Sequence, residues 1–161
     1  MIRRLAPDDA PELARLLVAN RTFLAPVEPL HAEDFFSPDG QRARIEAAEH
    51  LYAILERDVL VGTISLSNVV RGPCQSAHVG YWVDEMRNGR GLAARAVAEL
   101  VDLSFTELGL HRLEAATLVD NGASRRVLEK NRFTRIGVAP RYLRVGGGWR
   151  DHVLFQRTVE D

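Results

Sequence analysis

The 161-residue sequence contains one cysteine, one lysine and no apolar run close to the length of about 20 residues that a membrane span requires. A single cysteine, Cys74, excludes an intrachain disulfide and is compatible with a reducing compartment. Because Lys130 is the one lysine among 21 basic residues, anion recognition must rely on arginine, whose forked guanidinium makes multidentate contacts. Pro7 and Asp8 precede any apolar core, so no secretory leader is expected. We therefore expect a cytoplasmic protein.

The sequence also has no large excess of charge of either sign. The formal net charge is −1 at pH 7, so no global basic field recruits nucleic acid or an anionic membrane. With 46% hydrophobic residues, a chain of this length supports one ordinary core and is too short for two. No internal repeat or low-complexity tract interrupts it, and we predict a single domain over residues 1–161.

Hydrophobic periodicity and turn residues predict an antiparallel first part and an alternation of strands and helices later. Strands are expected at 2–5, 51–56, 59–69, 78–83, 113–119, 133–138, 141–145 and 149–157, and helices after Asp8 or Asp9 and at 38–50, 92–108 and 121–131. Residues 21–40, with Pro26, Pro29 and several aromatics, predict a bent segment that either walls a substrate groove or simply connects elements. The order predicts an α/β fold with a mixed, mainly antiparallel sheet of about seven strands, flanked by helices.

The most distinctive segment is NGRGLA, residues 88–93, between a strand-like run and a long amphipathic helix. Gly89 and Gly91 allow a tight turn that leaves several backbone N–H groups pointing outward, where the helix dipole favours negative charge. A glycine pair taken alone has two interpretations, a phosphate-binding turn or a turn with no ligand. The segments that follow decide between them.

Two further segments accompany this loop in a fixed order. NGAS at 121–124 opens a helix followed by Phe133, and the tail at 148–152 reads GWRDH. Together with GYWV at 80–83 and NGRGLA, they give a chain that resembles the GNAT N-acetyltransferase superfamily, and more narrowly the bacterial ribosomal-protein alanine N-acetyltransferases. The resemblance covers residues 2–157. In the family signature Q/R-x-x-G-x-G/A, Gly91 and Ala93 match, whereas Asn88 replaces the usual Gln or Arg and shifts more of the binding to the backbone.

The resemblance implies acetyl-CoA as the donor and no metal. It implies that the pantetheine arm lies along the strand at 79–83, that the loop N–H groups hold the pyrophosphate, and that Asn121 bonds a pantetheine amide. The predicted coenzyme-binding residues are Trp82, Val83, Asn88, Gly89, Arg90, Gly91, Leu92, Ala93, Asn121, Ser124, Arg126 and Lys130. For the basic side chains Arg90, Arg126 and Lys130, a solvated helix face is an equal alternative.

Acetyl transfer to an amine needs a neutral nucleophile, stabilisation of the oxyanion and a proton for the departing thiolate. Glu85, just beyond the strand, is the first candidate for the base, and its alternative is an exposed loop carboxylate. His78, on the same strand, is the second, and its alternative is a structural histidine. A backbone N–H near Val83 is the expected oxyanion donor, and Ser124 is the expected proton donor to the thiolate.

Other reactive side chains have weaker claims. Tyr142 is a spare proton donor or a packing residue of the final hairpin. Asp151 and His152 suggest a metal site or a triad, but no third residue stands at a suitable spacing, so they predict a hydrogen-bonding scaffold. Cys74 lies in the expected loop at 70–76 and has no designated base nearby, so it is read as incidental.

The acceptor is less determined than the donor. An α-amine has a pKa of about 7.7 to 8.0 and is partly neutral at pH 7, whereas a lysine amine, with a pKa of about 10.4, is almost wholly charged. We therefore predict the N-terminal amine of a protein such as a ribosomal protein. The alternatives are a small-molecule amine (a polyamine or an antibiotic) and a non-catalytic acyl-CoA-binding module. A dinucleotide-binding module is disfavoured because G-x-G-x-x-G is missing. A homodimer is possible, and neither a nucleic-acid nor a membrane partner is expected.

Overall fold

The computed structural model describes residues 1–160, which form seven strands, five α-helices and three short 3-10 helices. In chain order these are β1 (Ile2–Arg4), η1 (Pro7–Asp9), α1 (Ala10–Ala19), α2 (Arg21–Leu24), η2 (Glu33–Phe36), α3 (Pro38–Ala47), β2 (Leu51–Glu56), β3 (Val59–Val70), β4 (Ser76–Val83), η3 (Glu85–Arg87), α4 (Leu92–Thr106), β5 (Arg112–Leu118), α5 (Gly122–Lys130), β6 (Thr134–Val145) and β7 (Gly148–Thr158).

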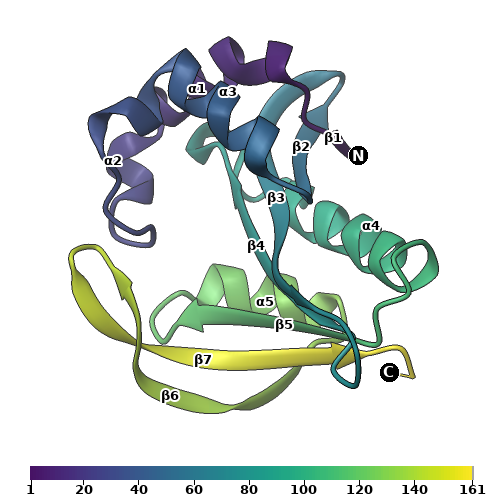
Figure 1. Cartoon of the computed structure of the whole chain (residues 1–161). Coiled ribbons are helices and arrows are strands. Elements are labelled where there is room, and N and C mark those ends of the chain that lie inside the picture. The colour runs from purple at the N-terminus through teal and green to yellow at the C-terminus, as the bar shows by residue number, and fades with distance from the viewer. Residues whose placement is uncertain (161) are drawn as a thin grey trace.

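One sheet contains all the strands of the described residues, in the order β1-β2-β3-β4-β5-β7-β6. Every neighbouring pair is antiparallel except β4 and β5. The predicted mixed, mainly antiparallel sheet with one parallel crossover is therefore confirmed. The crossover consists of η3 and α4, which follow β4 and return the chain to β5 (Figure 1).

Two predicted boundaries were wrong. The strands expected at 133–138 and 141–145 are one strand, β6, whose pairing with β7 is irregular between Ala139 and Leu143. Arg141, in that irregularity, has a φ of 47°. The helix expected to reach residue 50 ends at Ala47, because Ala48 is already extended (φ −84°, ψ 127°) and the chain must enter β2 at Leu51.

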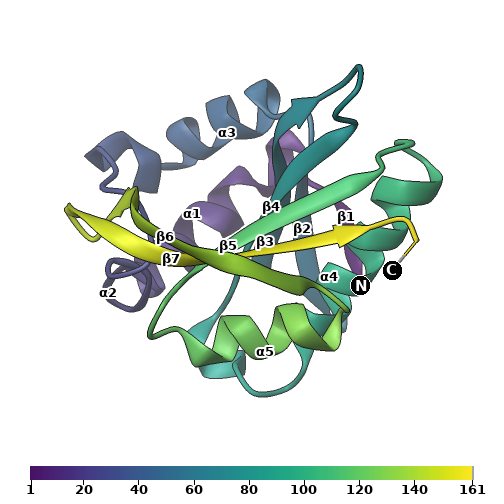
Figure 2. The same cartoon turned by 90° about the horizontal axis from the view of Figure 1, so that it is seen from below.

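Helices cover both faces of the sheet, with α1 to α3 on one side and α4 and α5 on the other (Figures 1 and 2). The strand β2 shows how the sequence provides for this. Its alternate residues Leu51, Ala53 and Leu55 belong to the core beneath α1 and α3, whereas Tyr52 and Ile54 belong to the core beneath α4. A strand that is apolar at every position is the pattern expected for a strand buried on both faces.

The parallel pair β4 and β5 is short. Only Ser76 to His78 pair with Arg112 to Glu114, although β4 continues to Val83 and β5 to Leu118. Beyond His78 the two strands diverge, which Figure 1 shows as the opening between the upper and lower parts of the molecule. The β4 edge that faces β5 is therefore unpaired over its last residues. From there the chain continues through η3 to NGRGLA.

No helix within residues 1–160 has both the length and the apolar character that crossing a bilayer would demand.

Candidate functional site

A cleft of about 700 Å³ lies where β4 and β5 diverge, a volume within the range of small-molecule sites. It extends from α2 and the loop after it, past the end of β4, to the first turns of α4 and α5. The residues that line it are Phe23, Leu24, Pro26, Val27, Tyr81, Trp82, Val83, Arg87, Asn88, Gly89, Gly91, Leu92, Ala93, Ala94, Leu118, Asp120, Asn121, Ala123, Ser124, Arg126, Val127, Lys130 and Arg150. The fold thus brings most of the predicted coenzyme-binding residues to one cavity.

The first turn of α4 opens into this cleft. Gly91 is the N-cap residue and has a left-handed backbone (φ 76°), as does Gly89 (φ 78°). No side chain caps the helix, so its first N–H groups, from Leu92 onward, are left without an intrahelical or side-chain acceptor. Exposed donors at the positive end of a 15-residue helix form an anion-binding site.

The charges along the cleft also favour an anion. Arg87, Arg126, Lys130 and Arg150 line it, and Asp120 is the single carboxylate among the described residues that do. Arg87 is paired with Glu56 and Arg150 lies 3.9 Å from Asp120, so the local positive field comes mainly from Arg126 and Lys130, in a chain whose net charge is −1. Arg87 and Arg150 were not predicted as site residues.

Arg90 lies differently from what the resemblance implied. Its Nη1 is 3.5 Å from Oε2 of Glu56, a residue of β2, and the side chain does not line the cleft. Arg87 forms a closer ion pair with the same carboxylate, and its hydrogen bond holds the pKa of Glu56 below the usual range. The role of Arg90 in phosphate binding stays a prediction, and Arg87 takes its place along the cavity wall.

At the opposite wall, Asn121 caps α5, as its Oδ1 accepts a hydrogen bond from the backbone N–H of Ser124 (3.1 Å). The Ser124 hydroxyl lies 2.8 Å from the hydroxyl of Tyr81 on β4, and Tyr81 also donates to the Ser124 carbonyl at 3.2 Å. Burial raises the pKa of Tyr81 to about 12, so this phenol remains protonated at physiological pH. Tyr81 therefore links β4 to α5 and orients the hydroxyl predicted to return a proton.

Tyr81 makes stability sensitive to alkaline pH. Its pKa is about 10 in the unfolded chain and about 12 when folded, so between these values the folded state binds more protons. The free energy of unfolding is expected to fall by about 2 to 3 kcal/mol as the pH rises from about 10 to about 12. Urea unfolding of wild type and Tyr81→Phe at a series of pH values measures this, and the difference between the two proteins removes the contribution of other tyrosines. An equal pH dependence in both proteins would contradict the assignment.

The two predicted bases lie outside the cleft lining. Glu85 is exposed in η3, and its backbone N–H donates to Oδ1 of Asn20 at 2.9 Å. His78 is half-buried at the closed end of the β4 and β5 pair, where its Nε2 is 2.8 Å from Oε2 of Glu114. Both assignments stay predictions, and the ion pair of His78 with Glu114 is a structural contact that the sequence did not reveal.

The WRDH tail forms contacts between β6 and β7, as expected of a scaffold. The Asp151 carboxylate accepts a hydrogen bond from the backbone N–H of Arg141 at 2.8 Å and closes the irregular part of β6. His152 is buried edge-on against Tyr142, with ring centroids 5.9 Å apart. Cys74 is exposed in the β3 to β4 loop. Among residues 1–160 no group of three or more His, Cys, Asp or Glu side chains is arranged to hold a metal ion.

Comparison with known proteins places this site in a family. The model of the acetyltransferase (GNAT) domain matches residues 1–134. A probable N-acetyltransferase of Bacillus subtilis, YjcK, is 37% identical over 94% of this chain and 89% of its own length, and the [ribosomal protein uS5]-alanine N-acetyltransferase of Escherichia coli is 31% identical over 100% and 89%. The structure of Mycobacterium smegmatis RimJ in complex with CoA-disulfide superposes with a TM-score of 0.93 at 32% identity, covering 99% of this chain and 81% of that one.

Proposed function

The chain belongs to the GNAT acetyltransferase family and is an acetyl-CoA-dependent N-acetyltransferase, and from this premise we propose that its acceptor is the N-terminal α-amine of a protein, such as a ribosomal protein. The observation that carries the acetyl-CoA half of this function is the cleft between the diverging strands, with an uncapped helix N-terminus and with Arg126 and Lys130 at its wall. The named activity of the Escherichia coli relative supports a protein acceptor.

The residues of the cleft fit the donor. The N–H groups of residues 88–93 and the first turn of α4 would hold the pyrophosphate, with Arg126 and Lys130 beside them. The unpaired edge of β4, at Trp82 and Val83, offers backbone groups to the pantetheine amides, as an added strand would use them. The same edge would offer a backbone N–H to the thioester oxygen as negative charge develops on it. Asn121 and Ser124 line the wall opposite.

Direct attack in a ternary complex completes the reaction. The neutral amine forms the new C–N bond at the thioester carbonyl while the C–S bond breaks, and its nitrogen loses one proton to a base or to water. The thiolate takes a proton from water, relayed or ordered by the Ser124 hydroxyl. Because a free thiol has a pKa near 8.5, the leaving group needs little help. We expect loss of Ser124 to reduce the rate less than loss of the phosphate cradle.

Turnover tests the proposal directly. Purified protein is mixed with acetyl-CoA and a panel of peptides, and free thiol and the acetylated product are measured. We expect acetylation of peptides with a free N-terminal amine and none of the same peptides with a blocked N-terminus. Selective turnover of polyamines or other small amines would overturn the protein acceptor, and coenzyme A binding without turnover of any amine would indicate a non-catalytic module.

The phosphate cradle is tested by Gly91→Ala. A side chain at φ 76° costs roughly 1 to 2 kcal/mol, which the loop relieves by moving its N–H groups away from the ligand. We expect the Kd for coenzyme A to rise about tenfold, measured by calorimetry. The matched control is Gly72→Ala, which has the same left-handed backbone (φ 66°) and equally open space but lies in the β3 to β4 loop. Equal affinities for the two variants would contradict the cradle.

We also propose that residues 1–161 are a single domain, supported by β1 and β7 belonging to one sheet. The predicted homodimer is tested by light scattering of the purified protein.

A further inference from the structure

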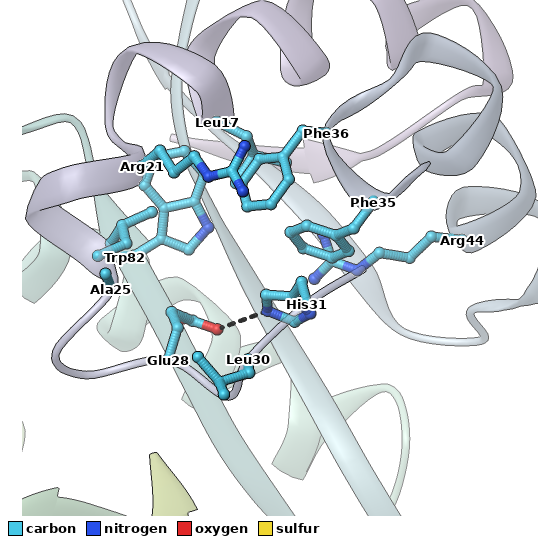
Figure 3. Close-up of a pocket in the computed structure, with 11 residues that line it drawn as sticks. Leu17, Arg21, Ala25, Glu28, Leu30, His31, Phe35, Phe36, Arg44 and Trp82 are labelled. Carbon is cyan, nitrogen blue, oxygen red and sulfur yellow. Dashed lines mark ion pairs between the residues drawn. The ribbon is translucent and has the colours of Figure 1, made fainter. Parts of the chain in front are cut away.

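A second cavity, of about 130 Å³, opens beside the cleft (Figure 3). It lies among α1, α2, the segment after α2, η2, α3 and the end of β4. Leu24 and Trp82 line both cavities, so the pocket adjoins the end of the cleft at which the acceptor must arrive. A cavity of about 150 Å³ can hold benzene, so this slightly smaller one has room for a small terminal side chain of a peptide.

Two titratable side chains face each other in this pocket. Oε2 of Glu28 is 3.5 Å from Nε2 of His31, and Figure 3 shows both side chains pointing into the cavity opposite Trp82. The imidazole stacks on Phe35, with ring centroids 3.6 Å apart and an interplanar angle of 5°. Its Nε2 is buried and contacts the Glu28 carboxylate without a hydrogen bond of good geometry. Phe35 therefore holds the ring with this nitrogen toward Glu28, and imidazole is the side chain that most often accepts a proton in catalysis.

Two backbone hydrogen bonds fix Glu28, one through its N–H and one through its carbonyl. Its N–H donates to the Leu24 carbonyl at 3.0 Å, and its carbonyl accepts a hydrogen bond from the N–H of Gly146 at 3.0 Å. Gly146 lies in the turn between β6 and β7, so the segment after α2 is attached to the final hairpin. Glu28 therefore lies in a segment that is hydrogen-bonded both to α2 and to the turn between β6 and β7.

Two cations complete the charged environment of the pair. Arg44 of α3 lies over Phe35 (5.4 Å from its centroid), and burial lowers the pKa of its guanidinium while the Glu28 carboxylate acts in the opposite direction. Arg21 of α2 stacks on Phe36 at 4.1 Å and is ion-paired with Glu33. Arg21 is therefore neutralised by a partner of its own, which leaves Glu28 as the carboxylate that faces the pocket.

We propose that Glu28 and His31 form the acceptor-side proton-accepting site: the α-ammonium of the acceptor binds against the Glu28 carboxylate beside Trp82 and transfers its proton to this pair. The neutral amine then forms the C–N bond as the C–S bond breaks, and its second proton leaves to the member of the pair that is still unprotonated. The pair releases both protons to solvent and the thiolate takes one from water at the opposite wall, so that one proton is released per acetyl transfer. This inference rests on the proposed function. It gives the base to the residues that line the acceptor end, in place of Glu85 and His78, which do not.

The test compares two acceptors that differ only in the basicity of the amine. One is a peptide with an ordinary N-terminus, and the other carries an aminooxy group there, a much weaker base that is neutral at pH 7. For Glu28→Gln at pH 7 we expect kcat/KM for the ordinary peptide to fall about 100-fold, which is typical of a lost general base. The defect shrinks as the pH rises above the pKa of the α-amine, about 8, and is under about threefold with the aminooxy peptide.

His31→Gln is expected to show the same acceptor dependence, and the double variant to lose no more than Glu28→Gln, because residues that act as a unit are not additive. Coenzyme A affinity and the Tm should match wild type in all three. Glu46→Gln and His111→Gln, at exposed positions, are the matched controls and should be unchanged.

Each outcome decides the proposal. A loss that is equal for both acceptors and at all pH values overturns it in favour of a purely structural role, and no loss overturns it outright. An acceptor-dependent loss in Glu85→Gln instead would return the base to Glu85. These failures leave the wild-type activity intact, whereas a wild type that turns over no amine overturns the proposed function and this inference with it.

Discussion

Gly62→Ala is expected to lower the free energy of unfolding by about 3 kcal/mol and to remove most of the activity. Gly62 on β3 pairs with Val83 on β4, and a Cβ at this position would lie 2.1 Å from the carbonyl oxygen of Trp82 and 2.9 Å from the Cα of Val83. Both neighbours are backbone atoms, which cannot rotate aside as the end of a flexible side chain can. The strand β4 must therefore move, and with it the edge proposed to bind the pantetheine arm.

Chemical denaturation measures the loss of stability, and single-turnover acetylation at saturating acetyl-CoA measures the activity of the molecules that remain folded. Gly137→Ala is the matched control, because Gly137 is also a strand residue but has nothing within 4 Å of an added Cβ. We expect that variant to stay within about 0.5 kcal/mol of wild type. Similar losses in both variants would show that glycine flexibility, and not the close approach of β3 to β4, determines the effect.

The second large effect is expected for Asn20→Ala, with a loss of about 2 to 4 kcal/mol in the free energy of unfolding. Asn20 is 2% exposed at the end of α1. Its Nδ2 donates to the Leu16 carbonyl (3.0 Å) and to Oδ1 of Asp84 (3.1 Å), and its Oδ1 accepts from the N–H of Glu85 (2.9 Å). Alanine removes all three bonds and leaves partly buried polar groups without a partner.

The same bonds connect the acceptor side to the phosphate loop. Asp84 lies 3.7 Å from Nε of Arg87, which lines the coenzyme cleft just before NGRGLA. We therefore expect Asn20→Ala to weaken coenzyme A binding as well, although Asn20 lines neither cavity. Calorimetric titration with coenzyme A measures this second effect.

A double-mutant cycle with Asp84→Ala separates the bond to Asp84 from general loss of packing. The losses of Asn20→Ala and Asp84→Ala should be less than additive, because each removes the bond that the other also removes. Asn131→Ala is the control, since that buried amide bonds only the carbonyls of Ala94 and Val127 and should be additive with Asp84→Ala. Full additivity for both pairs would contradict the proposed link.

Much of the donor half of the site was predictable because its signals are local. Gly89 and Gly91 have left-handed backbones, the start of α4 is uncapped, and Asn121 caps α5. Each of these features depends on a few consecutive residues. Two of these segments follow strands that the crossover makes parallel neighbours, so they meet at one edge of the sheet. The family resemblance added the identity of the ligand, which the local pattern alone did not contain.

The partners of individual charges were not predictable in the same way. Arg90 is matched with Glu56, 34 positions earlier, and His78 with Glu114, 36 positions later. Nothing in the sequence near Arg90 or His78 indicates that such a carboxylate is within reach. The fold thus supplied both Arg90 and His78 with a carboxylate partner that the sequence did not indicate. Arg87 lines the cleft, where Arg90 was expected.

By itself, then, the sequence determined the fold class and indicated the place of the phosphate loop, because hydrophobic period, turn glycines and helix starts act over short stretches of chain. The resemblance of its motifs to a known family supplied the donor. Only the tertiary structure decided which groups line the second pocket, where we propose that the acceptor binds. The Glu28 and His31 pair lies in the segment at 21–40, for which the composition left open a substrate-groove wall or a simple connection and singled out neither residue. It gains its position from the stacking of His31 on Phe35 and from the bond between Glu28 and the distant turn at Gly146, which come together only when the sheet and its helices have packed.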